Sequence, residues 1–287
     1  MTSSTTTTRT ATTAATTTTT NTTRSSTTRS SNTLSRTFTD TAVVTRRNLW
    51  HFVRQPDLLL FSTIQPVMFV LLFVYVFGGA ISGSLPPGVE YVDYLLPGIL
   101  VQSVAFRASQ TAVGLAEDLQ RGVMDRFRSM PMSRMAVLTG RTFADLFRNT
   151  VIIFLMIAVG YLVGFDFQGG AAAAAASLGL ILLFGYALSW VFAAIAFVAN
   201  GAEAAQSAGF VAIFPLVFAS TVFVPIETMP SWLRWFAENS PVSVTADAAR
   251  HLSIGGPVAD AALQSVLWSV GITVVFGAIA VWRYQRI

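Results

Sequence analysis

The densest set of chemically functional residues in this sequence is one short stretch, EDLQRGVMDRFRSMPMSR, at positions 117–134. It holds three carboxylates and four guanidinium groups, while long apolar runs lie on either side of it. Glu117 and Arg121 stand four residues apart, as do Arg121 and Asp125, and opposite charges at this spacing pair on a helix. The chemistry that this pattern favours is recognition by charge, which needs a partner surface.

An apolar stripe runs through the same stretch. Its members recur at helical spacing and are Leu119, Val123, Phe127 and Met130. Pro131 disfavours helical geometry at the residue before it, so the pattern predicts an amphipathic helix over 116–130. Three interpretations are open: a loop made basic by membrane orientation, a helix on lipid, and a helix docked on a protein. The last is favoured, because acids weaken binding to anionic lipid and complementary charges fix the register of a protein interface.

Several residue types are missing or scarce, which excludes whole classes of chemistry. The chain has no cysteine, so it has no disulfide, thiolate metal site or cysteine nucleophile. Its two histidines, His51 and His251, are too far apart in sequence to suggest a metal cluster. All eighteen basic residues are arginine, so neither a phosphate-binding P-loop lysine nor a Schiff-base lysine is available. ATP hydrolysis of the P-loop type is therefore not expected in this chain.

The composition predicts the elements that must position the charged stretch. The 287 residues are 53% hydrophobic and only 11% charged, whereas soluble domains carry about 25% charge. Six stretches are long enough to cross a bilayer, which takes about 20 residues. They are 58–79, 94–114, 147–165, 172–198, 204–224 and 262–282. We therefore expect an all-α, polytopic membrane protein with six transmembrane helices.

Arginine placement predicts the orientation of these spans. If the N-terminus is cytoplasmic, only Arg234 and Arg250 face outward, and the remaining arginines lie inside or, like Arg107, nearer the inner end of a span. Such a bias is the usual signature of orientation in a membrane. Both termini are then cytoplasmic, and the charged stretch follows the second span on the cytoplasmic side.

The N-terminal region differs from the rest of the chain. Residues 1–36 contain eighteen Thr, seven Ser and four Arg with no acid, a composition that predicts a disordered cytoplasmic tail ahead of a six-span membrane domain over 37–287. Its composition would also suit an organellar transit peptide, although periodic apolar residues are missing. A helix is expected over 38–55, lying at the inner membrane interface or serving as a plain linker. Its candidate lipid-facing residues are Arg46, Arg47, Trp50 and Arg54.

Polar residues and prolines inside the spans are candidates for a pathway or for gating. The set is Gln65, Pro66, Gln102, Arg107, Gln110, Asn149, Gln206 and Pro215. Structural packing against neighbouring helices is the alternative for each of them, and Arg107 is also close enough to the inner end to extend to the interface. The outer segment, 225–260, adds Trp232 and Trp235, whose indole rings suit a membrane interface or an outer gate.

Two long motifs carry a resemblance to a known family. They are VDYLLPGILVQSVAFRASQTAVGLAEDLQRGVMDRFRSMPMSRMAVLTGRTFADLFRN at 92–149 and FVPIETMPSWLRWFAENSPVSVTADAAR at 223–250. Together with RQPDLLLFSTIQPVMFVLLFVYVFGGAI, they resemble the permease subunits of type-2 ABC exporters, above all the daunorubicin/doxorubicin-resistance permeases of actinobacteria. The resemblance covers about residues 40–287, and the Thr-rich tail departs from the family pattern.

The resemblance implies a role for the charged stretch. It would be a coupling helix that docks on a separate ABC-type ATPase, which binds ATP and Mg, while this chain binds no cofactor. The implied coupling residues are Glu117, Asp118, Leu119, Arg121, Gly122, Val123, Asp125, Arg126, Phe127, Arg128 and Pro131. The family also implies short re-entrant helices between the fifth and sixth spans, a second permease copy, and the plasma membrane of a bacterium.

The expected activity is outward movement of an amphipathic small molecule, a drug or an antibiotic, with no covalent chemistry on this chain. Membrane lipid is an expected partner and nucleic acid is not. Export of a lipid, polymer or glycoconjugate by the same architecture is an alternative. A proton-driven secondary transporter is another, but it needs acids deep in the spans, and Glu203 lies only at a span edge.

Overall fold

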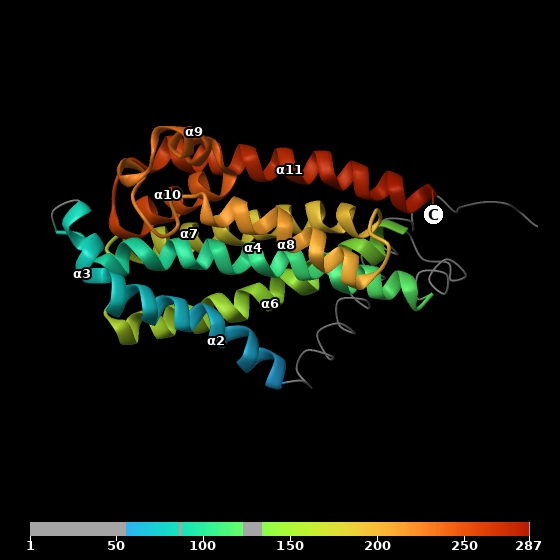
Figure 1. The fold of residues 1–287 in the computed structure, drawn as a ribbon, viewed down its shortest axis with the longest axis horizontal. Helices are drawn as coiled ribbons and strands as arrows, with labels where there is room; N and C mark the ends of the chain where they lie inside the picture. Colours follow the sequence, from blue (N-terminus) through green and yellow to red (C-terminus); the bar gives the residue numbers. More distant parts are fainter. Residues whose placement is uncertain (1–55, 86–87, 123–133, 287) are drawn as a thin grey trace, which may run out of the picture.

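The computed structural model describes residues 56–85, 88–122 and 134–286, and every regular element in these ranges is helical (Figure 1). The long helices lie roughly along one axis and form a bundle. They are α2 (Pro56–Leu72), α4 (Tyr91–Gln120), α6 (Arg134–Val163), α7 (Gly170–Ala196), α8 (Ala202–Phe218) and α11 (Val258–Arg286). Shorter helical pieces are η1 (Phe73–Phe77), α3 (Gly78–Ile81), η2 (Ser82–Ser84), η3 (Ile226–Thr228), α9 (Ser231–Asn239) and α10 (Pro241–Ile254).

Four of the helical stretches are long and apolar enough to cross a membrane. They are Ile64–Ser84, Asp145–Val163, Gly170–Ala196 and Val258–Tyr284. The 17-residue α8 is apolar but shorter, and the 30-residue α4 carries more polar residues. Helices suit this setting because each one satisfies its backbone hydrogen bonds internally, where no water is available. The prediction of an all-α, polytopic membrane protein is confirmed.

Two of the predicted stretches differ from the helices in detail. The stretch 58–79 contains a π-helical turn, η1, so its first helix does not continue as a regular α-helix to its end. The predicted stretch 204–224 extends beyond the end of α8, because this helix ends at Phe218, three residues after Pro215. Composition does not reveal this early stop, because the residues that follow Phe218 are still mostly apolar.

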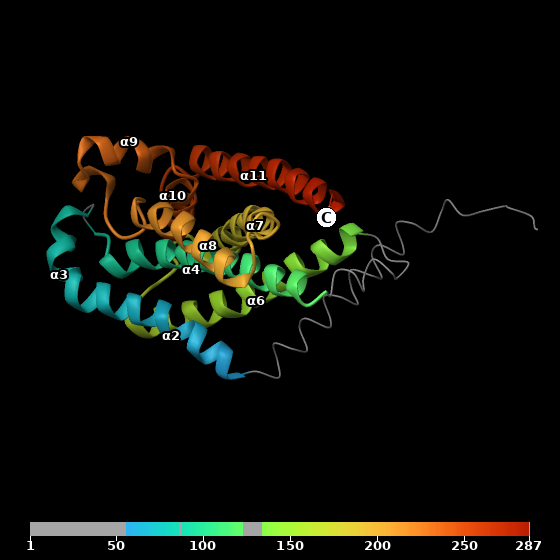
Figure 2. The ribbon, with the colours of Figure 1, turned by 45° about the vertical axis from the view of Figure 1, so that its right-hand side comes forward.

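The two ends of the bundle are built differently (Figures 1 and 2). We call one the capped end, because α3, α9 and α10 gather there beside the start of α4. At the opposite end, which we call the C-terminal end, α4 and α11 finish and α6 and α8 begin. The functional features described below fall at these two ends and between them.

The central helix is α4, which packs against α6, α7, α8 and α10. A row of small residues on α4 is fully buried and consists of Ala105, Ala108, Ala112 and Ala116. Small residues let helix backbones approach closely, which is how helices pack where the hydrophobic effect supplies little driving force. Larger side chains from α7, such as Phe184 and Phe192, complete the core around it.

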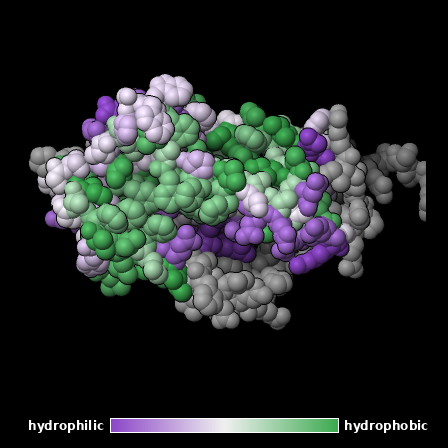
Figure 3. Space-filling view, in the orientation of Figure 1, coloured by the Kyte–Doolittle hydropathy of each residue, from purple (hydrophilic) through white to green (hydrophobic). Residues whose placement is uncertain are grey.

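The surface of the bundle is mostly apolar, as expected for a membrane protein. Hydrophobic residues cover most of the face seen in Figure 3, while hydrophilic ones gather in a central hollow and toward the C-terminal end. Several large apolar side chains on α6, α8 and α11 are more than half exposed, among them Phe154, Val211 and Leu267. Such a surface has lipid or another apolar chain as its natural neighbour.

The core predicts a measurable asymmetry between two phenylalanines. Phe184 is fully buried, so Phe184→Ala leaves a cavity, and we expect the free energy of unfolding to fall by about 3 kcal/mol. Phe154 is exposed on α6, so Phe154→Ala is the matched control, with an expected loss below about 1 kcal/mol. Thermal unfolding of the purified chain in detergent measures both, and equal losses would contradict the packing described here.

Candidate functional site

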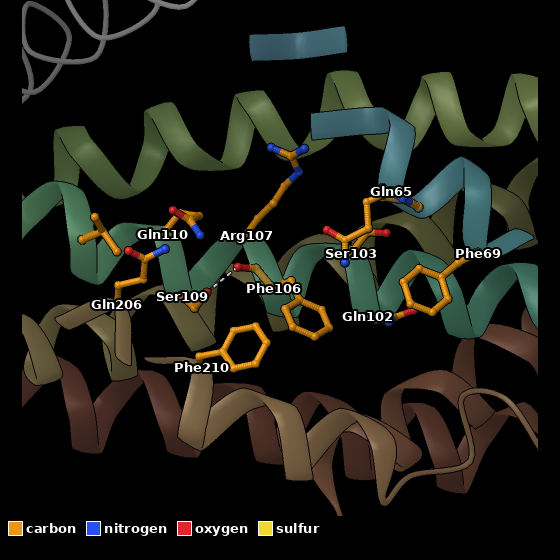
Figure 4. Close-up of a pocket in the computed structure, with 12 residues that line it drawn as sticks. Gln65, Phe69, Gln102, Ser103, Phe106, Arg107, Ser109, Gln110, Gln206 and Phe210 are labelled. Carbon is orange, nitrogen blue, oxygen red and sulfur yellow. Dashed lines mark hydrogen bonds between the residues drawn. The ribbon is translucent and has the colours of Figure 1, made fainter. Parts of the chain in front are cut away.

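A cavity of about 320 Å³ lies between α2, α4 and α8, in the middle of the bundle (Figure 4). Its lining residues are Gln65, Pro66, Phe69, Gln102, Ser103, Phe106, Arg107, Ser109, Gln110, Val113, Gln206 and Phe210. Four carboxamides from three helices therefore face one space inside an otherwise apolar bundle. This arrangement suits a ligand that offers both apolar surface and hydrogen-bonding groups.

Some polar groups of the cavity already form hydrogen bonds within the protein, whereas one buried acceptor forms none among the described residues. Ser103 donates its hydroxyl to the carbonyl of Ile99 at 2.7 Å, and Ser109 donates to Phe106 at 2.6 Å, so both protons are used locally. Gln102 is only 3% exposed, and its Oε1 accepts no hydrogen bond within the described structure. A buried acceptor without a partner costs free energy, so Gln102 offers a place for a donor group.

Aromatic rings lead away from this cavity toward the capped end. Phe106 and Phe210 line the cavity with ring centroids 6.3 Å apart. The row continues along α8 through Phe214 and Phe218 to Phe223, with successive centroid distances of 5.5, 4.3 and 5.4 Å. Spacings of this size are typical of interacting aromatic pairs. One apolar, polarisable surface therefore connects the cavity with the far end of the bundle.

The structure brings together only some of the predicted pathway residues. Gln102 and Arg107 both line the cavity, and Arg107 extends from α4 toward α6 (Figure 4). Pro215 lies on the exposed side of α8, outside the cavity lining. Trp232 and Trp235 are 74% and 70% exposed on α9 at the capped end, far along the chain from the lining residues. Their spacing places both indoles on one face of that short helix.

The described part of the charged stretch forms the end of α4 rather than the start of a separate helix. Arg121 is bonded through Nη2 to Glu117 Oε2 at 3.2 Å, which confirms the predicted pairing. The helix stops at Gln120, and Gly122 has a φ of +65°, a conformation that residues with a side chain rarely adopt. A helix beginning at 116 and running to 130, as predicted, is therefore interrupted at this turn.

The remaining predicted coupling and interfacial residues lie outside the described residues. They are Val123, Asp125, Arg126, Phe127, Arg128 and Pro131, together with Arg46, Arg47, Trp50 and Arg54. The tail over 1–36 and the helix over 38–55 lie outside them as well. Of the predicted apolar stripe, Leu119 is described, and it packs against the core of the bundle.

The end of α4 is in direct contact with the turn between α7 and α8. Glu117, Gln120 and Arg121 line a groove of about 380 Å³ together with residues 200–203 of that turn. Gln120 lies so close to Gly201 that a Cβ on the glycine would come within 2.3 Å of its Nε2. Gly201 also has a φ of +108°, which permits the sharp entry into α8. The end of α4 and the start of α8 are therefore closely packed at this point.

Sequence reasoning missed the most heavily bonded side chain of the capped end. The sequence placed Arg250 on the outer side of the membrane and assigned it no role, whereas in the structure its side chain is only 4% exposed and lies at the junction of α4, α8 and α10. The available signal was Asp247, three residues earlier on the same helical face, which pairs with Arg250 at 2.6 Å. An arginine with such a neighbour can enter a protein interior.

Long apolar helices around a cavity of carboxamides and phenylalanines define a multi-pass membrane protein of the transporter type. The profile of the ABC-2 type transporter family matches residues 39–253, and the chain belongs to this family. It is 33% identical over 83% of its length to the daunorubicin resistance ABC transporter permease protein DrrB1 of Streptomyces coeruleorubidus, of which it covers 82%.

Two further relatives match at lower identity. The chain is 24% identical to the probable doxorubicin resistance ABC transporter permease protein DrrC of Mycobacterium tuberculosis, over 86% of this chain and 88% of that protein. It is also 24% identical to the putative transport permease ycf38 of Porphyra purpurea, over 69% and 68% of the two chains. The chain is thus a permease subunit rather than the ATPase, and a permease of this kind works with an ABC ATPase subunit.

The contact between Gln120 and Gly201 yields a paired prediction. Gly201→Ala adds a methyl group at positive φ and against Gln120, and we expect it to cost about 1–3 kcal/mol of stability. Gly179→Ala is the control, because this glycine lies within α7 with open space around it, and alanine is favoured there by about 1 kcal/mol. Thermal midpoints that fall for Gly201→Ala and hold or rise for Gly179→Ala would agree with the structure.

Proposed function

We propose that this chain is the membrane-spanning permease of an ATP-driven exporter that moves an amphipathic small molecule outward. The observation that carries the proposal is the cavity between α2, α4 and α8, with its four carboxamides and its phenylalanines. Its volume lies at the lower end of the range of drug-sized sites, about 300–1,000 Å³. The drug-resistance names of the relatives support a drug or antibiotic as the cargo.

The proposal includes six spans, formed by α2 with η1 and α3, and by α4, α6, α7, α8 and α11. Helix α4 crosses despite its polar residues because most of its surface is buried among other helices. Arg121 and Arg283 are at the C-terminal end, and the arginine-rich start of α6 lies there too. This bias supports a cytoplasmic C-terminal end and an outer capped end, with both chain termini inside and α9 and α10 as the outer re-entrant helices.

A second permease copy completes the proposed unit. Phe210 lines the cavity, and it is exposed on α8 together with Phe214 and Phe218. A second copy facing this side of α8 would cover these rings and enlarge the space for cargo. We propose two permeases and two ATPase subunits, in which each ATPase binds ATP with Mg and this chain binds neither.

Coupling in this proposal runs through the segment that follows α4. The ATPase would dock on the region 117–131, and the groove shared by Glu117, Gln120 and the turn at 200–203 would pass the movement to α8. Because α4 and α8 both line the cavity, a shift of either helix changes the shape of the site. A bacterial plasma membrane is the proposed location.

The experiment that tests coupling is co-purification of the full chain with candidate ABC-type ATPase subunits. Arg126→Glu reverses a charge in the proposed docking face, and we expect it to lower the recovered complex at least about tenfold, since like charges across an interface cost several kcal/mol. Arg234→Glu is the matched control on α9 and should leave recovery unchanged. A complex that survives Arg126→Glu intact, with normal export, would remove the coupling role.

The cavity is tested by drug-stimulated ATPase activity of the same complex. Gln102→Leu keeps the approximate shape of the side chain but removes the buried acceptor. We therefore expect the concentration of doxorubicin that gives half-maximal stimulation to rise about tenfold. This change corresponds to the loss of one hydrogen bond of roughly 1.4 kcal/mol. Phe154→Ala, on the exposed face of α6, should not change it. An identical response of both variants would place the cargo elsewhere.

A further inference from the structure

The chain leaves helical geometry inside the bundle directly after α8. Residues 219–225 follow the end of this helix at Phe218, and Ser220, Thr221, Val222 and Phe223 are all buried. A buried segment without helix or sheet has backbone carbonyls that need partners from elsewhere. In a membrane protein this need is sharper, because lipid supplies no donors.

Side chains from two other helices supply those partners. Tyr94 of α4 donates its hydroxyl to the carbonyl of Thr221 at 3.1 Å, and Tyr91 donates to that of Phe223 at 3.0 Å. Arg250 of α10 donates through Nη2 to the carbonyls of both Thr221 and Val222, the latter at 2.9 Å. Three consecutive carbonyls are therefore satisfied entirely by side chains of α4 and α10.

Arg250 is itself held on every side. Its Nε donates to the carbonyl of Tyr94 at 2.7 Å, and its guanidinium lies 3.8 Å from the centre of the Tyr94 ring. Its Nη1 donates to Asp247 Oδ1 at 2.6 Å and to Thr221 Oγ1 at 3.3 Å. All three guanidinium nitrogens are bonded, so one side chain ties α4, α10 and the segment after α8 together.

Helix α4 packs closely against residues 219–225, and α10 is held by the loop before α7. A Cβ on Gly98 of α4 would lie 2.5 Å from the carbonyl oxygen of Val222 and 2.8 Å from Nη2 of Arg250, so α4 leaves no spare room here. The C-terminal end of α10 is hydrogen-bonded to the loop before α7, because the backbone amides of Gln168 and Gly169 both donate to the backbone carbonyl of Ser253. Helix α10 thus provides a firm support for Arg250.

We propose that Arg250 is a positioning residue that acts as the latch of the outer gate. It holds residues 219–225 against α4 in the conformation seen here, and the outer end opens when these bonds are exchanged for bonds to water. Phe223, beside this latch, is reached by aromatic contacts from the cavity along α8 through Phe218 and also from Phe69, which lines the cavity, so cargo that follows these rings arrives at the segment that Arg250 holds. The Asp247 side chain is 40% exposed, so water can reach the Arg250 guanidinium from the side on which Asp247 lies.

The latch is tested by cysteine accessibility, for which a chain without native cysteine is well suited. Val222→Cys places a thiol in the latched segment, where the native side chain is fully buried. Its rate of labelling by a fluorescent maleimide is measured on the full chain in lipid nanodiscs, alone and in complex with the ATPase. Trp232→Cys, at an exposed position of α9, is the positive control for rapid labelling in every condition.

We expect slow labelling of Cys at 222 without nucleotide and labelling faster by about tenfold when the complex is trapped with ATP and vanadate, a change of the size that allosteric coupling commonly gives. Adding Arg250→Met should make labelling fast with or without nucleotide. Arg234→Met, an outer arginine with one backbone bond to Glu227, is the matched control and should behave like the parent. Asp247→Ala, which removes the partner of Nη1, should shift labelling in the same direction and serves if Arg250→Met fails to fold.

Labelling that stays slow in both the Arg250 and Asp247 variants would overturn the latch. A parent whose labelling ignores nucleotide, in a complex that hydrolyses ATP, would show a purely structural arginine and overturn it as well. The assignment of this latch to an outer gate rests on the proposed exporter function. The latch proposal and the exporter proposal can nevertheless fail independently. If no ATPase binds the chain, the exporter proposal fails, while fast labelling caused by Arg250→Met on the isolated chain still shows that Arg250 holds residues 219–225 closed.

Discussion

A helix that ends inside an apolar environment leaves its last carbonyl groups without donors, and this constraint governs the capped end of the molecule. Helix α8 stops at Phe218, and the buried residues that follow it depend on Tyr91, Tyr94 and Arg250 for hydrogen bonds. Lipid cannot substitute for these donors, because its acyl chains offer no hydrogen-bond donor. The positions of α4 and α10 relative to α8 are therefore set by three side chains.

The same long helix links this junction to the other functional features. Helix α4 has 30 residues and at 1.5 Å per residue is about 45 Å long. Its first turn carries Tyr91 and Tyr94, its middle lines the cavity with Gln102 and Arg107, and its last turns carry Glu117. In the proposed exporter, a displacement of this helix at the C-terminal end would reach the cavity and the capped end together.

Part of this arrangement could be predicted from the sequence. Gln102 and Arg107 were predicted as pathway candidates because polar groups in apolar spans need a reason to be there, and both line the cavity. Asn149 satisfies the same criterion and yet lies outside the cavity lining, buried on α6. The difference depends on which side of each helix faces the cavity, and helix rotation about its axis is fixed by packing between helices.

Composition and arginine placement by themselves determined the class of molecule: a polytopic, all-helical membrane protein with one dense charged segment and no ATPase chemistry of its own. These properties are local, since hydropathy over about 20 residues decides whether a helix can lie in lipid. Only the tertiary structure decided that four carboxamides share one cavity and that the Arg250 side chain is buried rather than exposed to solvent. An arginine far along the chain from Tyr94 becomes a partner of its carbonyl only when three helices meet, and no local pattern contains that contact.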